Sequence, residues 1–262
     1  MTLSTPAMTA PDELRIERDG HVALVEIRRG PHNHVDARFM GLLADAFEQL
    51  DREPDCRCIV LASEGRAFCA GADFNSAGAK EDRDPSAFYV QAMRLFRGSK
   101  PVVAAVHGAA VGAGLGLALA ADFRVTCPEA RFSANFNRLG FHPGFGLSLT
   151  LAQLVGRQQA ALLFYTGRRI GGEEAVRIGL ADVLADEAGV RAQALALAQE
   201  IAASAPLAVE STRAALRQGL ADEVYAANQR ELVIQREQFR SVDFREGIAA
   251  MAARRTPVFD RR

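Results

Sequence analysis

The sequence predicts an α/β fold with a largely parallel sheet, followed by a helical C-terminal segment. Short apolar runs alternate with segments of helical periodicity up to about residue 186, which is typical of strands and helices that share a parallel sheet. From residue 187 onward the pattern is helical with only short breaks. Hydrophobic residues make up 49% and charged residues 24% of the 262 residues, as in an ordinary soluble globular protein.

The first elements follow from local patterns. Residues 13–27 hold two alternating runs that meet at Asp19-Gly20, which indicates a β-hairpin. Residues 36–51 place their apolar side chains at helical spacing, with Asp36 as the N-cap. These two segments therefore predict a hairpin followed by a helix.

The following segments continue the alternation. Residues 56–63 and 101–106 are continuous apolar runs, which are typical of strands buried on both faces. Between them, residues 85–98 predict a helix that ends at Gly98. Residues 122–133 predict further short strands. The C-terminal helices are expected in residues 189–206, 207–220, 221–241 and 243–255.

Charge, cysteines and the N-terminus exclude several classes of protein. A net charge of −1 gives no indication of nucleic-acid or anionic-membrane binding. The four cysteines form no CxxC pair, so we expect reduced, buried thiols in a cytoplasmic protein and no metal site. Residues 1–12 read as a disordered lead, because no basic cluster precedes an apolar run there.

The glycine-rich stretch HGAAVGAGLGLALAAD, residues 107–122, needs a separate explanation. Twenty residues from Val102 to Ala121 carry no formal charge, yet Ala and Gly supply little of the apolar transfer energy that a membrane span requires. The G-A-G-L-G spacing also differs from a dinucleotide loop. We expect a turn over residues 108–113 and a short buried helix over 114–121.

Such a helix start can bind negative charge, because its first N–H groups have no partner within the helix. Residues 70–72 form a second small-residue loop after a strand, and Asp73 could cap a following turn. Two loops that present backbone N–H groups could form an oxyanion hole. The alternative is two tight turns of an α/β core without any function.

Four segments of the chain together resemble the enoyl-CoA hydratase/isomerase (crotonase) superfamily. These segments are AFCAGADF at residues 67–74, KPVVAAVHGAAVGAGLGLALAADFRV at 100–125, ARFSANFNRLGFHPGFGLSLTLAQLVG at 130–156 and TGRRIGGEEAVRIGLAD at 166–182. The resemblance runs in order from about residue 13 to 260 and is specific for the superfamily rather than for one reaction. It implies the ClpP/crotonase spiral of ββα units over residues 13–186. Residues 187–262 would form a helical trimerisation segment, giving a homotrimer or a dimer of trimers.

The resemblance also implies a substrate and its site. An acyl-CoA thioester would bind with its carbonyl oxygen between the backbone N–H groups of Ala72 and Ala113. Coenzyme A would enter as part of the substrate, without a separate cofactor. Further substrate-binding residues would be Gly71, Asp73, Phe74, Gly112, Gly114, Gly116, Phe136 and Gly144. Arg254 and Arg255 are candidates for contact with CoA phosphates, or else a solvated basic pair.

The chain departs from the hydratases at both positions of the usual catalytic glutamates, which fall on Gly116 and Phe136. Neither side chain can exchange a proton. The nucleophilic aspartate of the related 4-chlorobenzoyl-CoA dehalogenase would fall on Gly144, so that chemistry is not supported either. His142 is the candidate catalytic residue, with a structural role in its loop as the alternative.

Other titratable residues near the expected pocket have structural interpretations. His32 and His34 are expected at the entrance or surface, His107 beside a turn, and Glu81, Asp82 and Asp84 in a covering stretch. The sequence therefore predicts an acyl-CoA lyase or isomerase of fatty acid metabolism that stabilises a thioester enolate. The alternative is a non-catalytic acyl-CoA-binding protein of the same fold.

Overall fold

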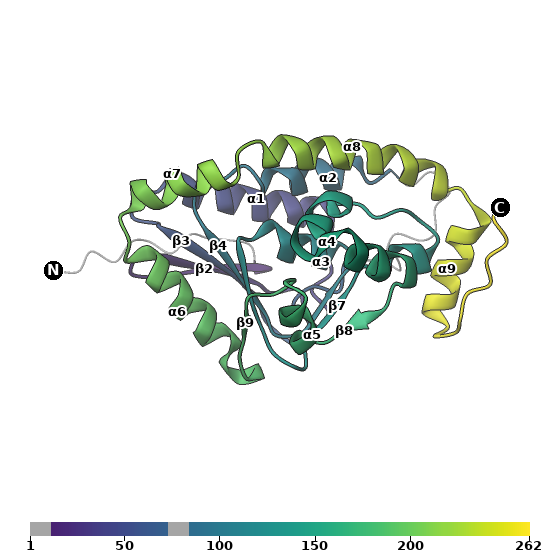
Figure 1. Cartoon of the computed structure of the whole chain (residues 1–262), viewed down its shortest axis with the longest axis horizontal. Coiled ribbons are helices and arrows are strands. Elements are labelled where there is room, and N and C mark those ends of the chain that lie inside the picture. Colours follow the sequence, from purple (N-terminus) through teal and green to yellow (C-terminus); the bar gives the residue numbers. More distant parts are fainter. Residues whose placement is uncertain (1–11, 73–83) are drawn as a thin grey trace.

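A mixed sheet with the strand order β1-β2-β3-β4-β6-β9 forms the centre of the molecule (Figure 1). The structure is a computed structural model that describes residues 12–72 and 84–262. The strands are β1 Leu14–Asp19, β2 Val22–Ile27, β3 Cys58–Ser63, β4 Val102–Val106, β6 Phe123–Thr126 and β9 Val183–Leu184. β1 and β2 form the predicted antiparallel hairpin, and every other neighbouring pair in this sheet is parallel.

The expected lead, residues 1–12, lies outside the described residues except for Asp12, and Asp73 and Phe74 also lie outside them.

The two predicted buried strands are confirmed. Every residue of β3 and of β4 is buried. Helix α6, Val190–Ala202, packs on β2, β3, β4 and β6, so the first part of the C-terminal segment belongs to the core layer itself. These strands are apolar without alternation because both of their faces are buried, one of them under α6.

A second, smaller sheet lies at the glycine-rich stretch. It contains β5 Ala109–Val111, β7 Arg131–Ser133 and β8 Arg169–Ile170. The prediction of a plain turn over residues 108–113 is therefore wrong. The strand forms because its partners are distant in sequence: β5 pairs with β7, and Cys69 exchanges backbone hydrogen bonds with Ala109 and Val111. Only the folded chain supplies those partners.

The predicted start of the first helix is confirmed, whereas the second helix ends earlier than expected. Helix α1, Ala37–Arg52, begins after Asp36, whose carboxylate accepts a 2.8 Å hydrogen bond from the Phe39 N–H. Helix α2, Ser86–Arg94, ends before the expected Gly98. Its last turn tightens, because the N–H groups of Leu95 and Phe96 donate to carbonyls only three residues back.

The middle and C-terminal helices cover the sheets. These elements are α3 Ala113–Ala120, the 3₁₀ helix η1 Asn135–Leu139, α4 Leu147–Thr166, α5 Gly172–Arg177, η2 Glu187–Gly189, α7 Pro206–Leu216, α8 Leu220–Gln238 and α9 Val242–Ala252. The helical C-terminal segment is confirmed. Helix α8 packs on α2 and α4, whereas α9 packs on η1 at the end of the molecule that carries the C-terminus (Figure 1).

The four cysteines are free and buried, as expected. Burial raises the pKa of the Cys58 and Cys69 thiols to about 12, so these thiols are unreactive near neutral pH.

Within residues 12–72 and 84–262, no single helix is long and apolar enough to cross a bilayer. One bent helix pair, 187–202 with 206–216, reaches that length and composition only when both helices are taken together.

Candidate active site

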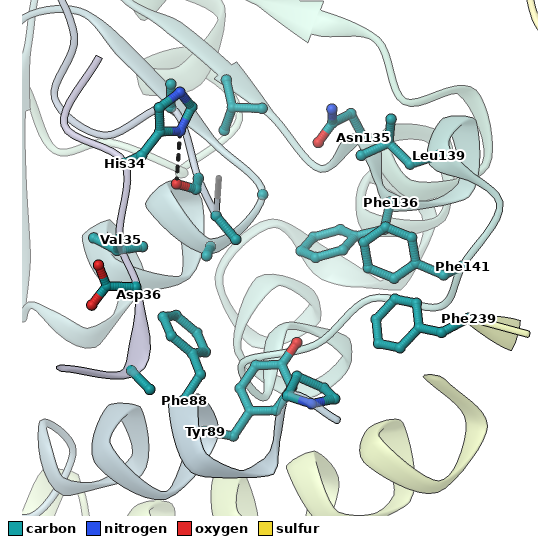
Figure 2. Close-up of a pocket in the computed structure, with 18 of the residues that line it drawn as sticks. His34, Val35, Asp36, Phe88, Tyr89, Asn135, Phe136, Leu139, Phe141 and Phe239 are labelled. Atoms are coloured by element: carbon teal, nitrogen blue, oxygen red, sulfur yellow. Dashed lines mark hydrogen bonds between the residues drawn. The ribbon is translucent and has the colours of Figure 1, made fainter. Parts of the chain in front are cut away.

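A cavity of about 350 Å³ lies between the N-terminal loop before α1, the segment 70–72, the start of α3, helix α2 and η1. Figure 2 shows His34, Val35 and Asp36 on one side of it and Phe136, Phe141 and Phe239 on the other. One side of the cavity is thus built from backbone and polar groups, and the other side is aromatic.

The backbone side begins at Gly71. Its φ of +95° is a left-handed conformation that favours glycine, and an added Cβ would lie 2.7 Å from the Val111 carbonyl oxygen. The same position lies 3.7 Å from the Ala113 nitrogen. The Gly71 carbonyl accepts a 3.1 Å hydrogen bond from the Val35 N–H. The segment 70–72 is therefore held beside the first residue of α3.

Helix α3 begins at Ala113, directly after Gly112. The Gly112 N–H donates to the Ser133 carbonyl, which fixes the entry into the helix at the end of β5 and β7. An added Cβ at Gly114 would lie 1.9 Å from the Cys69 carbonyl oxygen, so glycine is required for the helix to approach the 69–72 segment. This close approach explains the glycine content of the stretch at residues 107–122.

Five aromatic residues also line the cavity; Phe136, Phe141 and Phe239 lie on the opposite side, whereas Phe88 lies beside Asp36 (Figure 2). Phe88 and Tyr89 come from α2, Phe136 from η1, Phe141 from the loop after η1 and Phe239 from the end of α8. The ring centroids of Phe136 and Phe141 are 5.5 Å apart, and those of Phe141 and Phe239 are 4.9 Å apart. The Tyr89 hydroxyl donates a 3.0 Å hydrogen bond to Gln235 Oε1, and Asn135 adds an amide on the side of Phe136 (Figure 2).

Residues 17–262 match the family model described as enoyl-CoA hydratase/isomerase. The chain belongs to this family. It is 38% identical over 259 residues to the probable enoyl-CoA hydratase EchA14 of Mycobacterium tuberculosis, covering 94% of this chain and 98% of that protein. It is also 32% identical over 225 residues to 1,2-epoxyphenylacetyl-CoA isomerase of Escherichia coli, covering 83% and 86%.

A solved enoyl-CoA hydratase/isomerase from Pseudoalteromonas atlantica shares the fold. It superposes with a TM-score of 0.86 at 30% identity, over 95% of this chain and 100% of that chain. The crotonase fold predicted from the sequence is therefore confirmed. The chain is an acyl-CoA enzyme of the enoyl-CoA hydratase/isomerase type.

The structure brings together some of the sequence-predicted site residues of this enzyme. Gly71, Ala72, Gly112, Ala113 and Phe136 all line the cavity. Gly114, Gly116 and Gly144 lie behind its wall.

The positions of Gly116 and Gly144 are filled by aromatic side chains. An added Cβ at Gly116 would lie 2.5 Å from Phe145 Cγ, and one at Gly144 would lie 1.9 Å from the Tyr89 hydroxyl oxygen. A carboxylate at either position would overpack the interior. Phe136 itself is 5% exposed and packs edge-to-face on Phe141. Aromatic rings therefore fill the space beside Gly116 and at position 136.

His142 lies outside the cavity lining in the described part of the chain. Its backbone N–H donates to Gln238 Oε1, and its ring Nδ1 lies 2.7 Å from the Pro143 carbonyl oxygen, to which it donates. These contacts tie the 142–143 loop to α8. His107 Nε2 likewise donates to the Gly65 carbonyl at 2.8 Å. Both histidines hold loops in place.

Charged residues at the cavity edge are engaged with one another. Arg29 contacts Glu13 at 3.0 Å and Asp36 at 2.8 Å. Partial burial works against the ionised Asp36 carboxyl, but the Phe39 N–H and Arg29 outweigh it and lower the pKa of Asp36. Asp84 pairs with Arg236 at 3.0 Å. Both carboxylates are held ionised by their arginine partners.

The C-terminal arginines differ in their contacts. The Arg255 guanidinium is bound by both carboxylate oxygens of Glu246. Arg254 is exposed, and the described residues give its side chain no partner. Arg255 is exposed as well, so the two phosphate candidates differ in that the charge of Arg255 is paired with Glu246.

Several cavity residues were not found by sequence reasoning. They are Phe88, Tyr89, Asn135, Leu139, Phe141, Phe239 and Met251. The aromatic residues of α2 carried a helical pattern that does not say which face meets a cavity. Phe239 and Met251 come from the C-terminal segment, for which the sequence indicated subunit contacts and CoA-phosphate contacts but no part in the cavity.

Proposed function

We propose that this enzyme stabilises the enolate of an acyl-CoA thioester in an oxyanion hole formed by the backbone N–H groups of Ala72 and Ala113. The observation that carries the proposal is the close approach of the Gly71–Ala72 segment to the start of α3. Both groups line the same cavity, and the first N–H groups of a helix have no partner within it. Two such donors stabilise charge that develops on the thioester oxygen.

The acyl group would lie against the aromatic side of the cavity. Phe136, Phe141 and Phe239 offer apolar and aromatic surface there, which favours an apolar acyl chain or ring. The Escherichia coli relative named for 1,2-epoxyphenylacetyl-CoA is consistent with an aromatic acyl group in this family.

Catalysis would not use the usual pair of glutamates. Gly116 and Phe136 cannot exchange protons, and Phe145 fills the space beside Gly116. We propose that a proton is removed from or returned to the carbon beside the thioester carbonyl while the two N–H groups hold the oxygen. His142 remains the candidate from the sequence, and reaching the substrate would require its loop to leave the Pro143 and Gln238 contacts.

The proposal also covers the cofactor requirement, the cellular compartment and the oligomeric state of the enzyme. Coenzyme A would enter as part of the substrate, with no separate cofactor, because the backbone itself supplies the electrophilic groups. Four buried free cysteines fit a reducing compartment such as the cytoplasm. A homotrimer or a dimer of trimers would cover apolar side chains that are exposed on α7 and α8.

The test replaces Ala113 by proline. Proline is well tolerated at the first position of a helix, so Ala113→Pro removes one N–H donor while keeping α3. We expect loss of turnover by ~10²-fold or more, the effect of deleting one oxyanion donor. The readout is mass spectrometry of products after incubation with a panel of CoA thioesters, including apolar and aromatic acyl groups.

Ala113→Gly is the matched control, because it keeps the N–H and removes only the methyl group. Circular dichroism of both variants verifies that α3 and the core remain folded. If folded Ala113→Pro turns over its thioester as fast as Ala113→Gly does, the oxyanion assignment is refuted.

A further inference from the structure

The His34 side chain contacts the peptide group proposed as one half of the oxyanion hole. Its Nδ1 lies 3.1 Å from the Gly71 carbonyl oxygen, the contact drawn as a dashed line in Figure 2. A carbonyl oxygen can only accept, so His34 Nδ1–H is the donor. The same oxygen accepts a 3.1 Å bond from the Val35 N–H. Both lone pairs of the Gly71 carbonyl are therefore engaged by two consecutive residues of the loop before α1.

The Gly71 carbonyl and the Ala72 N–H belong to one planar peptide unit. Fixing the direction of the carbonyl therefore fixes the direction of the N–H on its opposite side. Donors on the carbonyl oxygen also polarise the unit and make its N–H a stronger donor, since linked hydrogen bonds strengthen one another. Gly71 has no side chain of its own that could hold this orientation.

We propose that His34 is a positioning residue of the oxyanion hole, which orients and polarises the Gly71–Ala72 peptide toward the thioester oxygen. The inference rests on the proposed function, because it assigns His34 to the same hole. His34 acts through the peptide and uses its Nδ1 proton to do so. The role is therefore distinct from that of a general acid or base, which would have to give this proton away.

The test needs a probe that reports charge stabilisation by the oxyanion hole and does not depend on the unidentified catalytic acid or base. Acetoacetyl-CoA is suitable, because its α-carbon is acidic and its bound enolate has its own near-ultraviolet absorption. Titration of the enzyme with acetoacetyl-CoA gives a dissociation constant and an enolate amplitude. Titration with coenzyme A, which lacks the thioester carbonyl, measures the affinity for the rest of the ligand.

His34→Leu removes the donor, whereas His34→Asn keeps an N–H at about the place of Nδ1. We expect His34→Leu to reduce the enolate amplitude or the acetoacetyl-CoA affinity about tenfold, less than the ~10²-fold or more lost with a direct oxyanion donor. Coenzyme A affinity should be unchanged. His34→Asn should recover most of the enolate signal.

His21→Leu is the matched control. His21 also donates from Nδ1 to a backbone carbonyl, that of Asp55 at 2.9 Å, but it lies on the β1–β2 turn and does not line the cavity. Its loss should leave the enolate signal at the level of the unmodified enzyme. Thermal unfolding of all three variants identifies any general loss of stability.

The experiment distinguishes failure of the His34 role from failure of the proposed oxyanion hole. If the unmodified enzyme binds acetoacetyl-CoA and forms its enolate, but His34→Leu does so equally well, the role of His34 is refuted and the oxyanion hole stands. An equal loss of coenzyme A and acetoacetyl-CoA affinity in His34→Leu would also overturn it, in favour of direct ligand contact. If the unmodified enzyme forms no enolate at all, the proposed function itself fails.

Discussion

We propose that the two glutamates of the usual hydratase mechanism would fall on Gly116 and Phe136 in this chain. Phe145 stands 2.5 Å from the place of a Gly116 Cβ, so the absence of a carboxylate is built into the packing around α3. The aromatic side also carries two polar groups, the Tyr89 hydroxyl, which donates to Gln235, and the Asn135 amide. At the scale of residues, the cavity is suited to apolar contact and to charge stabilisation by the backbone.

The first prediction concerns the hydration of crotonyl-CoA. The rate of hydration is measured as the loss of the substrate's enoyl absorbance. We expect a rate far below ~10 s⁻¹, an ordinary enzyme turnover, because neither Gly116 nor Phe136 can activate water or protonate carbon. A rate of ~10 s⁻¹ or more would mean that another residue supplies the acid and base, and His142→Ala would then be the variant to measure.

Restoring both carboxylates tests the same assignment. The double variant Gly116→Glu with Phe136→Glu should raise the hydration rate only if Phe145 also moves aside. The glutamate added at position 116 would otherwise clash with the Phe145 ring. We expect Gly116→Glu by itself to lose about 1–3 kcal/mol of stability by overpacking. Urea unfolding measures that loss, and adding Phe145→Ala should relieve part of it.

At the scale of elements, Glu231 of α8 links the C-terminal segment to the start of α4. Its buried carboxylate accepts the Gly146 N–H at 2.7 Å and the Ser148 N–H at 2.9 Å. These are N-terminal groups of α4 that have no partner within the helix. The same loop holds Phe145 against α3. One carboxylate therefore caps a helix and fixes the aromatic ring beside Gly116.

The second prediction is that Glu231→Ala destabilises the fold by about 1–3 kcal/mol per N–H left without a partner. Chemical unfolding in urea should show a lower midpoint at similar slope. Glu237→Ala, an exposed position of the same helix, is the control and should leave the midpoint nearly unchanged. Equal midpoints for Glu231→Ala and Glu237→Ala would contradict the capping role.

At the scale of the whole molecule, α7 is the most weakly buried of the long helices described here. Arg213 is its one buried residue, whereas Leu207 is 80% and Leu216 is 83% exposed. A helix that faces water along one side normally buries an apolar stripe on the other. The exposed leucines fit a surface that is covered by another subunit.

The third prediction follows from this surface. Light scattering coupled to size exclusion should give a trimer or a hexamer at micromolar concentration, and Leu207→Glu with Leu216→Glu should shift it toward the monomer. Tyr165→Glu changes a comparably exposed side chain on α4, outside residues 187–262, and should leave the mass unchanged. A monomeric unmodified protein would refute the assembly proposal.

The sequence alone determined the features that depend on neighbours along the chain. Apolar runs identified β3 and β4, Asp36 identified the start of α1, and helical periodicity identified the C-terminal helices. The motif residues Gly71, Ala72, Gly112 and Ala113 were placed at a common site, and the structure brings them to one cavity. Periodicity, capping and motif order are local properties, which is why the sequence carries them.

Only the tertiary structure decided which side chains meet. It placed Phe239 of α8 against Phe141, Phe145 against Gly116 and the His34 ring on the Gly71 carbonyl, and it left His142 outside the cavity lining in the described part of the chain. Strand β5 and the early end of α2 also depended on distant partners or on tightening of the last turn. A sequence pattern states that a residue is buried or polar. The partner it contacts is set by how the helices and sheets pack, because those contacts join residues that are far apart along the chain.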